Sequence, residues 1–273
     1  MSSLLAALRT LAHLSAWNAL YAGALVLAAC QTINLPHAPL ALLGACALAL
    51  GVFLLDRVKP ADALLDPADE AANPERFAFH RRHARTLRAA IVCALAAGGT
   101  LMILDDRPIA ASFALLAPAG VLLYGTVRPA RGPRLKDRPV RKNLAVALAM
   151  ACFALAIALG PSLRLAPRSL LVRAPAELLV FAWIALVVFA DAALCDLDDA
   201  PTDARFGTRT FANTLPAPTL WAGALLVQFL AIPLLVLAHR SAGSPLAPAL
   251  WWALAVPLST LAIHLANPPR VRD

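Results

Sequence analysis

Continuous apolar runs separated by short polar connections recur along the whole chain. Each run is 16 to 20 residues long, close to the roughly 20 residues that a helix needs to cross a hydrocarbon core. The runs do not alternate apolar and polar residues, as the strands of a membrane barrel would. The pattern therefore predicts an all-α polytopic membrane protein with about eight transmembrane helices. The expected spans are residues 14–33, 39–55, 89–104, 109–127, 144–160, 178–195, 220–237 and 246–265.

The composition is that of an integral membrane protein. Of the 273 residues, 60% are hydrophobic and 15% are charged, which is far too apolar for a soluble domain. No stretch has the composition of a separate soluble domain, so residues 1–273 are expected to form a single membrane domain. The five cysteines stand singly, without the paired spacing of a metal site.

The distribution of lysine and arginine predicts the orientation of the chain. With the N-terminus in the cytoplasm, 19 of the 24 basic residues fall on the cytoplasmic side and five on the outer side. The positive-inside rule then places both termini in the cytoplasm, as in a multi-pass protein of a bacterial inner membrane. It also accounts for the net charge of +8 without a nucleic-acid partner. The seven cations of residues 128–142 suit anionic lipid, and one or two could instead neutralise a diphosphate.

A cluster of aspartates directly follows the sixth run. Asp196, Asp199 and Asp203 have offsets of three and seven residues, so a continuing helix would bring them within about 60° of one face. Converging carboxylates favour a hard cation, and Mg²⁺ takes one or two carboxylates together with phosphate oxygens. The alternative is an acidic solvated loop. Pro201 could end the helix between the second and third aspartate.

The stretch from Cys195 to Thr210 reads C-D-L-D-D-A-P-T-D-A-R-F-G-T-R-T. It resembles the second aspartate-rich motif of the UbiA superfamily of intramembrane prenyltransferases. The matching positions are Asp196, Asp199, Asp203, Gly207, Arg209 and Thr210. The resemblance implies a UbiA-like helical bundle whose cavity faces the cytoplasm, with Mg²⁺ on the three aspartates and Arg209 on a polyprenyl diphosphate.

The end of the second run matches the family's first motif, N-D-x-x-D-x-x-x-D, only in part. Asp56 stands at the first aspartate, but Leu55, Lys59 and Ala63 occupy the other positions. The resemblance implies that Asp56 faces the second motif as a further metal ligand, with Arg57 beside it as a substrate-binding residue. A plain ion pair or a helix cap is the alternative for Asp56.

Four further residues are candidates for the site. Asn18 is either an interhelical hydrogen-bonding residue or the counterpart of a family Asn that lies near the diphosphate. Tyr124 resembles a family tyrosine that precedes a basic residue. Lys142 opens the fifth run together with Asn143, and the two could point into the cavity. Asp191 is the hypothesised general base, which would take a proton from the acceptor substrate.

These observations predict an enzyme that transfers a prenyl group from a polyprenyl diphosphate to an aromatic or other lipophilic acceptor within the membrane. The degenerate first motif leaves an alternative, a catalytically degenerate UbiA-fold protein that binds or carries an isoprenoid lipid. A CDP-alcohol phosphotransferase is disfavoured because its D-G-x-x-A-R core is absent. A solute transporter is disfavoured because the aspartates lie at a helix end rather than at the bilayer midplane.

Overall fold

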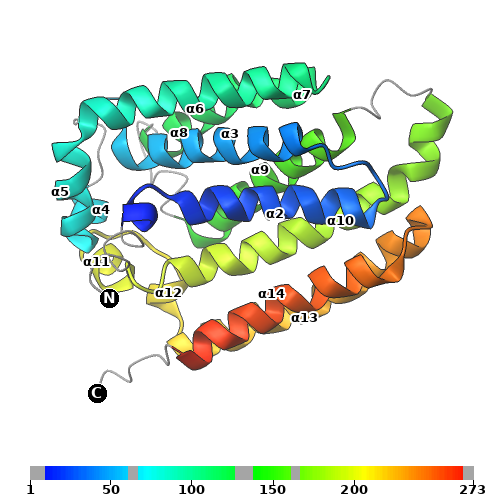
Figure 1. Cartoon of the computed structure of the whole chain (residues 1–273). Coiled ribbons are helices and arrows are strands. Elements are labelled where there is room, and N and C mark those ends of the chain that lie inside the picture. The colour runs from blue at the N-terminus through cyan, green and yellow to red at the C-terminus, as the bar shows by residue number, and fades with distance from the viewer. Residues whose placement is uncertain (1–9, 61–66, 127–137, 161–166, 267–273) are drawn as a thin grey trace. The chain divides into compact units, whose positions relative to one another are not determined.

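The computed structural model describes residues 10–60, 67–126, 138–160 and 167–266 (Figure 1). The structure is 86% helix, and these described ranges contain no strand. Within these ranges, six helices are long and apolar enough to cross a membrane, with mean hydropathies between 1.7 and 2.5. They are α3 (Pro39–Val58), α6 (Ala84–Leu104), α9 (Pro139–Leu159), α10 (Pro167–Cys195), α13 (Ala217–Ala242) and α14 (Leu246–Ala266). The prediction of an all-helical polytopic membrane protein is thus confirmed.

The first and fourth expected spans form shorter helices. The first is α2 (Ala16–Thr32), whose 17 residues extend about 26 Å at 1.5 Å per residue. The fourth is divided into α7 (Pro108–Ala111) and α8 (Phe113–Thr126). The division falls at Ser112, whose hydroxyl donates to the Ile109 carbonyl at 2.6 Å. The total of eight spans therefore stays a prediction.

One of two compact units comprises residues 1–27, 37–134 and 156–161 and is called unit 1 here. Its α3 and α6 lie side by side, with the short α5 (Pro74–Arg82), preceded by α4 (Pro67–Ala72), at one end (Figure 1). The two long helices touch at small residues: a Cβ on Gly98 would lie 2.8 Å from the Leu48 backbone nitrogen. Such close backbone contact is typical of membrane helices, which gain little from burying apolar side chains away from lipid.

The other compact unit comprises residues 28–36, 135–155 and 162–273 and is called unit 2. In it α13 packs against both α10 and α14. The chain reverses between α13 and α14 at Gly243, whose φ of +64° is left-handed, a conformation that glycine adopts without a steric penalty. The end of α2 is tied to this unit, because the Ser244 hydroxyl donates to the Thr32 carbonyl at 2.7 Å.

The aspartate cluster lies on a broken segment at the C-terminal end of α10. This helix ends at Cys195, a turn follows, and the short helix α11 (Ala200–Arg205) begins one residue before Pro201. Proline favours the first turn of a helix because its missing N–H would have no partner there. A second short helix, α12 (Phe211–Thr214), leads into α13. The helix therefore does not continue through the three aspartates, and the common face expected for them does not form.

Candidate functional site

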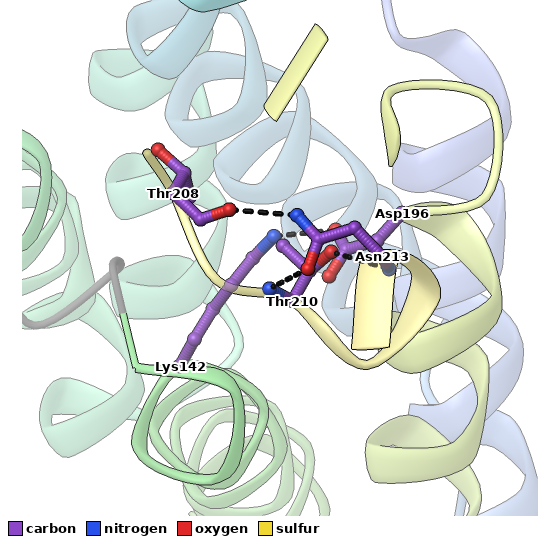
Figure 2. A network of polar contacts seen from close by, with 5 residues as sticks. All are labelled: Lys142, Asp196, Thr208, Thr210 and Asn213. Atoms are coloured by element: carbon purple, nitrogen blue, oxygen red, sulfur yellow. Dashed lines mark hydrogen bonds and ion pairs between the residues drawn. The ribbon is translucent and has the colours of Figure 1, made fainter. Parts of the chain in front are cut away.

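The centre of the candidate site is an ion pair between Lys142 and Asp196 in unit 2. Lys142 rises from the first turn of α9, and its ammonium donates to the carboxylate of Asp196, which follows α10 (Figure 2). The side chain of Asp196 is 10% exposed and that of Lys142 is 22% exposed. Two residues that the sequence predicted for the site are thus in direct contact. A carboxylate this well buried needs such a cation, since removing one partner of a buried pair costs about 3–5 kcal/mol.

A hydrogen-bonded turn belongs to the same polar network (Figure 2). Thr210 caps α12: its hydroxyl accepts from the Asn213 backbone N–H, and its own N–H donates to the Asn213 side-chain oxygen at 3.0 Å. The Asn213 amide also donates to the Thr208 carbonyl at 2.7 Å. Gly207 enters the turn with a φ of +74°, which explains a glycine at this place. The turn holds Arg209 exposed between the two buried threonines.

The other two aspartates of the motif are positioned by the broken helix. Asp199 is the residue before α11, and its carbonyl accepts from the Asp203 backbone N–H at 2.9 Å. Among the described residues, no group of three or more His, Cys, Asp or Glu side chains is arranged to hold a metal ion. The donor chemistry fits Mg²⁺ delivered together with phosphate oxygens, which needs one or two carboxylates, rather than a cage of protein ligands.

Asp191 makes a different contact from Asp196. Its carboxylate accepts from the Gln228 amide of α13 at 2.7 Å, and Gln228 is buried. Asp191 lies inside α10 whereas Asp196 follows its last residue, and Asp191 meets α13 while Asp196 meets α9. The geometry assigns Asp191 an interhelical hydrogen bond, and its role as a base stays a prediction.

Asn143, the residue after Lys142, was named from the sequence only as a residue that could point into the cavity. Asn143 is fully buried, and neither its amide nitrogen nor its amide oxygen has a hydrogen-bond partner among the residues that the structure describes. Each such buried group costs roughly 1–3 kcal/mol when it lacks a partner. The sequence places an amide at this position, but only the packing shows that it is buried and unbonded.

The first aspartate region, at the end of α3 in unit 1, has its own internal cation. Lys59 donates to the Asp56 carboxylate at 2.7 Å. The Lys59 side chain is 6% exposed whereas that of Asp56 is 43% exposed. Arg88 of α6 donates to the Lys59 carbonyl at 3.2 Å. The ion pair considered for Asp56 thus exists, with Lys59 as the partner, at one of the positions that departs from the motif.

The remaining predicted residues also belong to unit 1. Asn18 lies partly buried in the first turn of α2, and Arg57 lies partly buried beside Asp56. Tyr124 lies in α8, and its side chain is outside the described part of the chain. That these residues and Asp56 meet the Lys142–Asp196 pair stays a prediction.

Comparison with known proteins adds no relative. The chain matches no protein-family profile, no curated protein and no solved structure. The resemblance to the UbiA superfamily therefore rests on the motif residues alone.

Proposed function

We propose that this protein is a Mg²⁺-dependent intramembrane prenyltransferase that acts on a polyprenyl diphosphate. The observation that carries the proposal is the ion pair between the buried Asp196 and the partly buried Lys142 at the end of α10, a helix of membrane-spanning length. A polyprenyl diphosphate has an apolar tail that suits lipid and an anionic head that needs cations. A site with both charge signs at the end of a membrane helix suits such a molecule.

The proposal includes the complete membrane arrangement. In it α2 and the α7–α8 pair are two further spans, which gives eight, and both termini lie in the cytoplasm of a bacterium. Lysine and arginine support this orientation, because 19 of 24 then fall on one side. The bundle has a UbiA-like cavity that opens toward the cytoplasmic side.

Each predicted residue has a role in this proposal. Mg²⁺, when bound, neutralises charge that builds up on the leaving diphosphate. The cationic side chains add to this neutralisation in a setting shielded from water. The metal-binding residues are Asp56, Asp196, Asp199 and Asp203, and the substrate-binding residues are Asn18, Arg57, Tyr124, Lys142 and Arg209.

The reaction is a transfer of an allylic carbon. The C–O bond to the diphosphate breaks, and its electron pair leaves with the diphosphate. The electrons of an aromatic ring or of another nucleophilic acceptor then form the new bond to the allylic carbon. The acceptor finally loses a proton, for which Asp191 is the predicted base.

A second candidate is a protein of the same fold that binds or carries an isoprenoid lipid without catalysis. The Lys59–Asp56 contact favours it, because Lys59 stands at a position where the first motif has an aspartate, so a cation replaces a metal ligand of that region. This candidate predicts diphosphate binding without transfer.

Binding of radiolabelled geranylgeranyl diphosphate to the purified protein in detergent tests the proposal. We expect Mg²⁺-dependent binding in the wild type and its loss in Asp196→Asn, which keeps the side-chain shape and removes the charge. Asp198→Asn is the matched control, because Asp198 is an exposed acid of the same turn. Absence of binding by the folded wild type would overturn both candidates. Binding without transfer in a screen of aromatic and hydroxyl acceptors would favour the lipid-binding candidate.

A further inference from the structure

Asn143 is a buried polar residue that the fold does not use. It is fully enclosed, and neither amide atom is bonded within the described ranges. Most buried polar side chains in native proteins have a partner, so an exception calls for an explanation. An apolar side chain of similar size would remove the unfavourable desolvation of the amide. The amide therefore has a use outside the internal packing of the protein.

The residues next to Asn143 along the chain favour an anion. It lies in the first turns of α9, directly after Lys142. Arg138 and Arg141 at the start of this helix are exposed, and the N-terminal end of a helix carries partial positive charge. The Lys142 ammonium is close enough to bond Asp196. An amide nitrogen can donate to a phosphate oxygen while the amide oxygen accepts from water.

We infer that Asn143 is a ligand-binding residue whose amide nitrogen donates to a phosphate oxygen. Together with Lys142, it forms the anion-binding half of the site, and Asp196 forms the half that attracts cations. In this arrangement Asp196 holds the Lys142 ammonium beside the phosphate position. The inference rests on the proposed function for the identity of the ligand as a prenyl diphosphate, and it adds a binding residue to that site.

The variant Asn143→Leu separates a ligand-binding role from a structural one. Because it removes an amide that has no internal partner, we expect Tm to stay the same or to rise by about 2–4 °C. We expect the Kd for geranylgeranyl diphosphate with Mg²⁺ to rise about tenfold to a hundredfold, the size of a lost hydrogen bond to a charged group. An unchanged Kd in a folded Asn143→Leu protein would overturn the inference.

Thr32→Val is the matched control. The hydroxyl of Thr32 is also buried and unbonded among the described residues, but Thr32 lies at the end of α2 and bonds Ser244 through its backbone. Its replacement should leave the Kd unchanged. If Asn143→Leu is too bulky to fold, Asn143→Ala answers the same question, since an unchanged Kd in that variant also overturns the inference.

The source of the phosphate is decided by a second set of ligands. Inorganic diphosphate and phosphatidylglycerol are titrated against the same variants in detergent free of other phospholipid. Binding of inorganic diphosphate by the wild type, weakened in Asn143→Leu, without binding of the prenyl diphosphate would leave the inference standing and the proposed function wrong. Equal binding of the prenyl diphosphate by the wild type and Asn143→Leu would overturn the inference and leave the proposed function standing. Weakening confined to phosphatidylglycerol would show a lipid headgroup site and overturn the assignment to a diphosphate.

Discussion

The two aspartate regions use the same pair of residue types in opposite ways. Each has an aspartate at the C-terminal end of a helix of membrane-spanning length, and each aspartate is bonded to a lysine. At the end of α3 the buried partner is Lys59, and at the end of α10 the buried partner is Asp196. The first pair is local, three residues apart, whereas the second joins residues 54 apart on different helices.

The common feature has an electrostatic reason. The C-terminal end of a helix carries partial negative charge, which disfavours a carboxylate there and favours a cation. A lysine beside each aspartate relieves this. The difference in exposure determines which carboxylate depends more on its lysine. The half-exposed Asp56 is also stabilised by water, whereas the enclosed Asp196 depends on Lys142. Only the second region therefore has a carboxylate that is shielded from water and depends on a protein cation for its stabilisation.

The largest expected effect is the difference in stability loss between replacing Lys142 and replacing Lys59. Lys142→Met leaves the buried carboxylate of Asp196 without its ammonium, so we expect a loss of about 3–5 kcal/mol. Lys59→Met breaks a pair whose acid is largely exposed, and such pairs contribute about 0–1 kcal/mol. Thermal unfolding of both variants in the same detergent measures the difference. Equal losses of Tm would show that the contrast between the two regions is wrong.

Replacing Asp196 should also reduce diphosphate binding more than replacing Asp56 does. Asp196→Asn should abolish detectable Mg²⁺-dependent binding of geranylgeranyl diphosphate. Asp56→Asn should weaken it by no more than about tenfold, or about 1.4 kcal/mol, because Lys59 and Ala63 occupy the other aspartate positions of the first motif. Titration of the labelled ligand over a range of Mg²⁺ concentrations checks both. A larger effect of Asp56→Asn would make the first region the dominant cation site.

The backbone of Lys59 offers a finer test. Its φ of 54° and ψ of 155° lie near a region that is almost exclusive to glycine and that costs other residues about 1–3 kcal/mol. Lys59→Gly relieves this strain, so its Tm should exceed that of Lys59→Ala by an amount equivalent to at least about 1 kcal/mol. Differential scanning calorimetry of the two variants measures this. If alanine is as stable as glycine, the strain is absent and the lysine is held by its side chain alone.

The smallest effect concerns the unit that carries the first region. In α5, outside the membrane-spanning helices, His80 is buried and its ring bonds the His13 carbonyl at 3.0 Å. Burial lowers the pKa of His80 below 6.5; the bond to His13 raises it, and Arg76, His13 and Arg57 lower it further. Folded His80 is thus neutral where the unfolded chain already takes up a proton, so stability falls as pH drops below about 6.5.

Measuring Tm between pH 7.5 and 5 tests this pH dependence. We expect a decline below pH 6.5 that is smaller in His80→Gln, which keeps a side-chain donor but does not titrate. His37→Gln is the control, since His37 is exposed. A decline of the same size in His80→Gln would assign it to other groups.

The sequence by itself determined the membrane character and most helix positions. The hydropathy of a segment is a property of its own residues and does not depend on which other segments it packs against. The six long helices accordingly cover apolar runs that were predicted from the sequence. The predicted end of α10 at Cys195 is also confirmed. Pro201 was expected to end the helix between Asp199 and Asp203. The helix instead ends at Cys195, before the first aspartate, and Pro201 lies in the first turn of α11.

Only the tertiary structure shows which polar side chains bond one another across the helices. Lys142 meets Asp196 across 54 residues and Gln228 meets Asp191 across 37, and no local pattern specifies such pairs. They depend on how each helix is rotated about its axis and which helix it packs against, so one residue of difference turns a side chain by about 100°. For the same reason the sequence shows an asparagine at position 143, whereas only the packed structure shows that it is enclosed without a partner in the described part of the chain.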